Sequence, residues 1–207
     1  MPVNELLIKI LIYTSSFSIF VLLGVLIFTN RKSGGIYTYT KAYLLFALYI
    51  ITASYTEWTL INTGMRGIHN HFMTHIFCPL EFILLASLII TVNKKFKREL
   101  KVIVSPAIII TVLIQFSTNF EQVSGEAYTI QAFSLAFMAL YTLLANNYST
   151  KEQVAWILFS IFFYFSSTGF IFLFGFMGKL IILHHLHVCV NLLTNITLSL
   201  SFACKRL

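Results

Sequence analysis

The sequence predicts an all-α, polytopic membrane protein built as a bundle of seven transmembrane helices. Of its 207 residues, 58% are hydrophobic and only 10% are charged, whereas soluble domains carry about a quarter charged residues. The hydrophobic residues form long runs, and a helix needs about 20 apolar residues to cross a bilayer. The basic residues lie between these runs, as they do in proteins whose charges flank membrane segments.

Seven apolar runs account for nearly the whole chain, so we expect one transmembrane domain over residues 1–207. The first run begins near the N-terminus and shows no small-residue cleavage site, which favours a membrane helix over a signal peptide. The fourth run is the shortest, and Pro106 lies near its expected start, where proline is tolerated. The predicted helices comprise residues 6–30, 39–62, 71–93, 102–118, 127–146, 153–175 and 180–203.

Pro79 falls inside the third predicted helix, residues 71–93. Proline has no backbone N–H, and within a helix it frees the carbonyl of the residue four positions earlier, here His75. We therefore expect a kink at this point. The connections between the runs are short, which favours a compact bundle in which every lipid-exposed backbone group bonds within its own helix.

The orientation follows from counting Lys and Arg on alternate sides of the expected helices. Lys9, Arg66 and Lys179 fall on one side, and the other eleven of the 14 basic residues fall on the opposite side. Because basic residues concentrate on the cytoplasmic side, we expect the N-terminus outside and the C-terminus in the cytoplasm. The expected location is a bacterial cytoplasmic (inner) membrane.

Five of the cytoplasmic basic residues form a dense group, called the basic cluster below. Its expected role is to fix the topology, and it could also bind anionic lipid headgroups or a cytoplasmic protein partner. The net charge of +7 does not predict nucleic-acid binding, because the charges flank apolar runs. The basic cluster consists of Lys94, Lys95, Lys97, Arg98 and Lys101.

Few ionisable residues fall within the predicted helices, and such residues usually face a bundle interior or a cavity. The alternating helix directions place four of them at one depth in the outer half of the membrane. On the third predicted helix Glu81 lies about 9 Å deeper than His75, which is six residues earlier, at 1.5 Å per residue. The four residues at one depth are Glu57, His75, His184 and His187.

The seventh helix carries these histidines on a polar stripe. At about 100° per residue, His184, His187, Asn191 and Asn195 fall within a sector of roughly 80°, while His185 points elsewhere. On the third helix His75 and Glu81 are about 120° apart if the helix is straight.

Three interpretations of this polar group remain open. It could be an interhelical hydrogen-bond network, or a pocket that responds to a ligand or to protons, since histidines titrate near neutral pH. It could also bind Zn²⁺ through His75, His184 and His187, with Glu57 or Glu81 acting on a bound water.

Two resemblances bear on function. The pattern His184-x-x-His187-x-x-x-Asn191-x-x-x-Asn195, with Pro79–Leu80–Glu81–Phe82, resembles small bacterial seven-helix membrane proteins of unassigned function, some encoded beside signalling genes.

The second resemblance is to the seven-helix hydrolases that include alkaline ceramidases and adiponectin-receptor-like proteins. That superfamily pairs Ser, His and Asp on the second and third helices with His-x-x-x-His on the seventh. Ser54, His75, His184 and His187 are similar, but the chain has no Asp and its histidine spacing is three.

These observations favour a non-enzymatic sensory, regulatory or accessory membrane protein. It would act through partners, as in a signalling or defence operon. No nucleophile elbow, phosphate-binding glycine loop or mid-helix retinal lysine is apparent. One alternative is a zinc-dependent membrane lipid hydrolase or amidase, which the second resemblance implies. Another is a small channel or transporter that self-associates.

Overall fold

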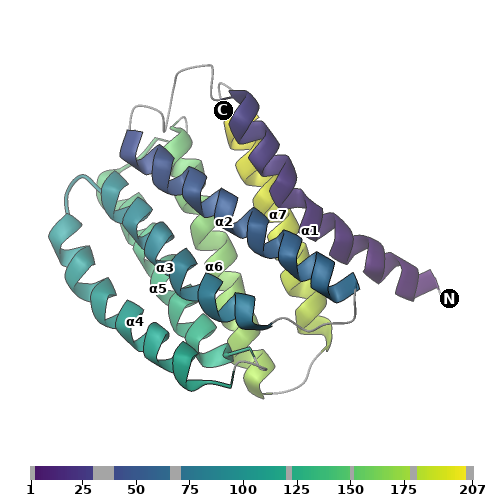
Figure 1. Cartoon of the computed structure of the whole chain (residues 1–207). Coiled ribbons are helices and arrows are strands. Elements are labelled where there is room, and N and C mark those ends of the chain that lie inside the picture. The colour runs from purple at the N-terminus through teal and green to yellow at the C-terminus, as the bar shows by residue number, and fades with distance from the viewer. Residues whose placement is uncertain are drawn as a thin grey trace.

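A computed structural model describes residues 3–29, 40–65, 71–119, 123–149, 152–177 and 181–203, and its regular structure is entirely α-helical (Figure 1). The all-α class and the seven helices expected from the sequence are confirmed. Apart from the start of α4, every helix end lies within three residues of its expected position. The helices are α1 (Val3–Thr29), α2 (Thr40–Met65), α3 (His71–Val92), α4 (Lys97–Ser117), α5 (Gly125–Asn146), α6 (Gln153–Met177) and α7 (Ile181–Ala203).

Six of the helices, α1 to α6, are long and apolar enough to cross a membrane. Their qualifying segments have 19 to 23 residues and mean hydropathies between 1.4 and 2.4. Helix α7 has 23 residues but is not among these six. The side chains of its first turn lie outside the described residues, so the seventh membrane span stays a prediction.

Helix α4 begins at Lys97, five residues before the position expected from the sequence. The expectation was wrong because Lys97, Arg98 and Lys101 were assigned to a connection. Basic residues at a helix N-terminus oppose the helix dipole, and in α4 only Glu99 in the first turn compensates for them. As a result, Pro106 lies well inside α4 rather than near its start.

In its C-terminal half α4 buries polar side chains and exposes apolar ones, the reverse of a water-soluble helix. Toward its neighbours it buries Thr111 and Gln115, each 0% exposed, together with Leu100 and Val104. A large set of apolar side chains is exposed instead, which fits contact with lipid. These exposed residues are Val102, Ile103, Ile109, Ile110, Leu113 and Phe116.

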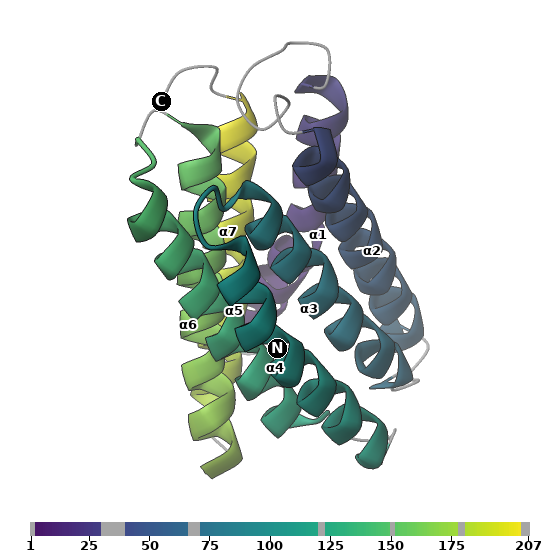
Figure 2. The same cartoon turned by 90° about the vertical axis from the view of Figure 1, so that its left-hand side faces the viewer.

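Six helices form a closed ring, and α4 lies outside it. Contacts join α1 to α2, α2 to α3, α3 to α5, α5 to α6, α6 to α7, and α7 back to α1. Helix α4 packs on α3 and α5 from the outer side, as Figures 1 and 2 show. The ring encloses a space that α4 does not reach.

The apolar core fills the half of the ring nearest the basic cluster, which is called the basic end below. Phe46 of α2 stacks on Phe202 of α7 with ring centroids 5.4 Å apart. Leu22, Phe82 and Ile157 from α1, α3 and α6 are 0 to 1% exposed and belong to the same core cluster. The opposite half of the ring, called the cavity end below, is therefore where the remaining polar side chains can gather.

Asn93 fixes the turn between α3 and α4 at the basic end. Its side-chain oxygen accepts hydrogen bonds from the backbone N–H groups of Lys95 and Phe96, at 3.0 and 2.7 Å. Its amide nitrogen donates to the Thr142 hydroxyl of α5 at 3.0 Å. The Tyr148 hydroxyl adds a further bond to the Val92 carbonyl. One buried side chain thus connects three helices at this end.

We predict that Asn93→Ala lowers the free energy of unfolding by about 1–3 kcal/mol, because two backbone donors and a buried hydroxyl lose their partner. Reversible unfolding in mixed detergent–SDS micelles, followed by circular dichroism, measures this difference.

The control is Lys97→Ala, a change of an exposed side chain in the same turn. It should shift the free energy of unfolding by no more than about 0.5 kcal/mol. Equal effects of the two substitutions would contradict the role given to Asn93.

Candidate functional site: a polar cavity inside the helix ring

A cavity of about 420 Å³ lies inside the ring. Each of the six ring helices contributes to its wall, while no residue of α4 does. Its volume falls within the range of small-molecule sites, about 300 to 1,000 Å³. The acidic, imidazole, carboxamide and phenol side chains that line it are Glu57, Glu81, His187, Asn191, Asn195, Tyr49, Tyr128 and Tyr164.

The cavity lies toward the cavity end of the bundle. Its α5 lining comes from the first turns of that helix, and its α6 lining comes from the second half of that one. Val123, which precedes α5 and is 40% exposed, also lines it, so the cavity extends to this end of the bundle. The basic cluster lies at the opposite end, and its five side chains are exposed.

Most of the residues expected to form a pocket line this cavity. Glu57, Glu81, His187, Asn191 and Asn195, which come from three different helices, share its wall. The structure therefore brings the two carboxyl groups and much of the α7 stripe to one space.

His75 and His184 do not join this group in the described structure. His75 is 0% exposed and is not a lining residue, and its Nδ1 lies 2.8 Å from the Gln115 carbonyl oxygen of α4. The side chain of His184 lies outside the described residues. His185 is half-buried and does not line the cavity.

The carboxyl group of Glu81 is held at the cavity wall by neutral donors. Gln131 of α5 donates from Nε2 to Oε2 of Glu81 at 2.6 Å, and the Tyr49 hydroxyl of α2 is a second partner. The Cys78 thiol donates to the Gln131 amide oxygen, which fixes the direction of that amide. Glu81 is 5% exposed, so its orientation is set by these contacts with α2 and α5.

Aromatic rings form the wall contributed by α5 and α6. Tyr128 stacks on Phe172 with centroids 4.9 Å apart. The imidazole of His187 lies 6.0 Å from the rings of both Tyr164 and Phe172. Phe165 meets Tyr164 edge to face at 4.9 Å. The cavity thus combines two carboxyl groups with a largely aromatic wall.

Asn191 and Asn195 also join α7 to α1. Asn191 donates to the Ser15 hydroxyl at 3.1 Å, and Asn195 donates to the Ser18 hydroxyl at 2.8 Å. Ser15 in turn donates to the Val188 carbonyl at 3.1 Å. The part of the predicted stripe formed by Asn191 and Asn195 is therefore an interhelical hydrogen-bond network, one of the three interpretations given above.

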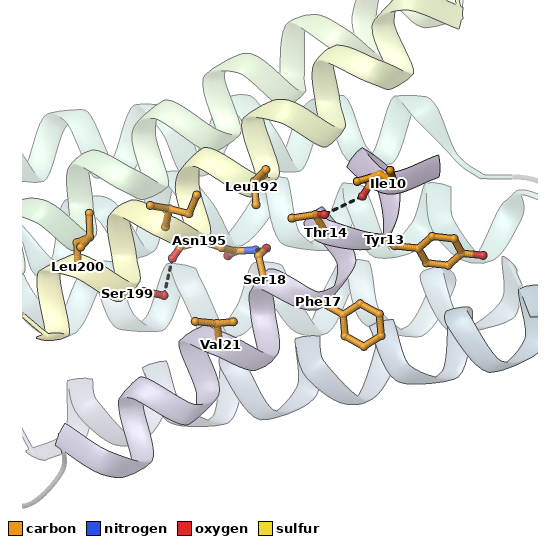
Figure 3. Close-up of a pocket in the computed structure, with 11 residues that line it drawn as sticks. Ile10, Tyr13, Thr14, Phe17, Ser18, Val21, Leu192, Asn195, Ser199 and Leu200 are labelled. Atoms are coloured by element: carbon orange, nitrogen blue, oxygen red, sulfur yellow. Dashed lines mark hydrogen bonds between the residues drawn. The ribbon is translucent and has the colours of Figure 1, made fainter. Parts of the chain in front are cut away.

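A second, apolar groove lies along the outer side of the α1–α7 contact, as Figure 3 shows. Its volume is about 660 Å³. The hydroxyls of Thr14 and Ser199 at its wall bond to the carbonyls of Ile10 and Asn195 on their own helices. The groove accordingly presents mostly hydrocarbon from residues such as Phe17.

Sequence reasoning missed several partners of the expected residues. Gln131 is a polar residue in an apolar run, and a search that included uncharged amides would have singled it out. Ser15 and Ser18 are three residues apart on α1, a spacing that puts both on one helix face. Asn191 and Asn195 likewise share one face of α7. Two polar residues on one face of each helix were the sequence signal for the α1–α7 network.

Among the described residues, no three His, Cys, Asp or Glu side chains are grouped so that they could hold a metal ion. Of the expected zinc ligands, His75 faces α4 and His187 faces the aromatic wall. The described part of the chain therefore gives the zinc hypothesis no support.

Comparisons of the chain with protein-family models, with curated proteins and with solved structures find no match. Neither resemblance drawn from the sequence is tested by them.

We predict that Asn195 and Ser18 are energetically coupled. In a double-mutant cycle of Asn195→Ala and Ser18→Ala, the coupling energy should be about 0.6 kcal/mol, with an upper bound of about 1.7 kcal/mol, as for other interhelical bonds in membranes. Unfolding in mixed micelles provides the four free energies.

Thr197→Ala serves as the control, because the Thr197 hydroxyl bonds to the Leu193 carbonyl of its own helix. Its effect should add to that of Ser18→Ala. A coupling of zero between Asn195 and Ser18 would show that the network does not hold α1 to α7.

Proposed function

We propose that this protein is a sensory or regulatory membrane protein whose polar cavity binds a small molecule. One observation carries the proposal: a single occupant of this cavity would touch side chains from all six ring helices. Binding there can therefore change how the helices pack without any extramembrane domain. A ligand shifts such an equilibrium only if it binds one arrangement of the helices more tightly than the other.

The proposal includes the topology expected from the charge distribution. All seven helices would cross the membrane, with the N-terminus outside and the C-terminus in the cytoplasm. The cavity would then lie in the outer half of the membrane and receive its ligand from outside. The basic cluster would lie at the cytoplasmic surface, next to anionic lipid headgroups and to the partner protein that reads out the signal.

The packing of the basic end favours a sensor over a channel. Phe46, Phe82 and Leu85 are 0 to 1% exposed and fill the ring on the basic side of the cavity. Buried side chains at this position interrupt a continuous water path through the ring. The cavity therefore has the form of a pocket with a closed base, as a ligand-binding protein requires.

The topology predicts opposite labelling from the two sides. In a variant whose native cysteines are replaced by serine, Val123→Cys should react with a membrane-impermeant maleimide in intact cells. Lys97→Cys should react only after the membrane is permeabilised. Both positions are exposed in the structure, so access rather than burial decides the result. The reverse pattern would mean that the cavity faces the cytoplasm.

The ligand-binding role predicts that small polar metabolites raise the unfolding temperature of the purified protein. Stabilisation by a ligand equals RT ln(1 + [L]/Kd). Ala53→Phe fills the cavity and should abolish the effect of any active compound, because Ala53 is a lining residue. Ile51→Phe, an exposed change on the same helix, should leave it intact.

Two results would count against the proposed function. In the first, no compound in the library stabilises the protein, or Ala53→Phe responds as the parent does. In the second, proteoliposomes pass the active compound faster than empty liposomes, which would favour the transporter alternative.

A further inference from the structure

We propose that the cavity is built to bind an organic cation, a compound with a primary or quaternary ammonium group on a small hydrocarbon body. This inference rests on the proposed function and specifies the chemical class of its ligand. It follows from the charge of the lining, from the neutral donors around Glu81 and from the aromatic wall.

The cavity has two acidic side chains and no matching strong base. Glu57 and Glu81 line it, whereas no Lys or Arg does. His187 is the sole basic side chain among the residues that line it. Within a membrane a carboxylate is costly unless a cation or several hydrogen-bond donors compensate it. A bound ammonium group would supply the missing positive charge.

The contacts of Glu81 supply no positive charge. Its partners Gln131 and Tyr49 are neutral, so they orient the carboxyl group without adding a positive charge. A carboxylate has about four acceptor sites, and these two partners occupy only part of that capacity. Since Glu81 also lines the cavity, the remaining sites are available to an ammonium group there.

The aromatic wall favours a cation with a hydrocarbon body. An ammonium group within about 6 Å of a phenol or phenyl face is attracted by the ring quadrupole, more strongly when water is excluded. Tyr128, Tyr164 and Phe172 supply such rings.

The two carboxyl groups lie at different levels of the cavity. Tyr49 contacts Glu81, and Glu57 is eight residues further along α2, which is about 12 Å at 1.5 Å per residue. Glu57 lies toward the cavity end and is half-buried. It can attract a cation as it enters, while Glu81 holds the charged group deeper inside.

Binding of matched cation and neutral pairs tests this inference. Tetramethylammonium, choline and phenethylammonium are titrated into the protein in a non-ionic maltoside detergent, by calorimetry. Their neutral isosteres are 3,3-dimethylbutan-1-ol for choline and phenethyl alcohol for phenethylammonium. At least one cation should bind, and its isostere should bind at least about tenfold more weakly, the loss expected when a charge-assisted contact is removed.

Isosteric variants identify the site. Glu81→Gln and Glu57→Gln should each weaken the cation at least about tenfold, while Glu99→Gln, an exposed acid at the basic end, should not. Tyr164→Phe should keep the affinity, and Tyr164→Leu should lower it by about threefold or more. Thermal unfolding of each variant shows that it is folded.

The outcomes separate this inference from the proposed function. If neutral isosteres bind as well as the cations, or if both Gln variants keep full affinity, the cationic ligand class is wrong. The same follows if no cation binds while an uncharged or anionic metabolite stabilises the protein in an Ala53→Phe-sensitive way, and the proposed function then stands. If nothing binds in the cavity, both fail.

Discussion

The carboxyl group of Glu81 joins three helices inside the bundle. It sits on α3, accepts a hydrogen bond from Gln131 of α5 and interacts with the Tyr49 hydroxyl of α2. Lipid cannot hydrogen-bond to such groups, so a buried carboxyl group depends on partners within the protein. This requirement sets the positions of the three helices around the cavity. The neighbouring Asn191 and Asn195 impose the same requirement on α1 and α7.

The same constraint explains why the two ends of the bundle differ. At the basic end, apolar side chains such as Phe46 and Leu22 fill the ring, and buried polar groups such as Asn93 and Ser201 lie near the helix ends. Toward the cavity end, polar side chains replace them around the cavity of about 420 Å³. A cavity results where hydrogen-bonding geometry, rather than close packing, determines the spacing of the helices.

The sequence predicted the helices well because long apolar runs have few other solutions in a membrane. It also predicted which polar residues face inward, since Glu57, Glu81 and His187 line one cavity. The sequence did not predict features that depend on contact with another helix. The direction of His75 is set by the carbonyl of Gln115 on α4, and the start of α4 is set by the Asn93 turn. Neither contact is visible in a single run of residues.

The proposal of a cationic ligand rests on the uncharged partners of Glu81. A purely structural carboxyl group would be expected to have a basic partner or to be enclosed by packing. Glu81 instead meets an amide and a phenol on one side and open volume on the other. The amide of Gln131 is itself fixed by Cys78, so this geometry exists before any ligand arrives. A site arranged in advance spends less of its interaction energy on ordering when it binds. That preorganisation distinguishes a binding cavity from a gap left by imperfect packing.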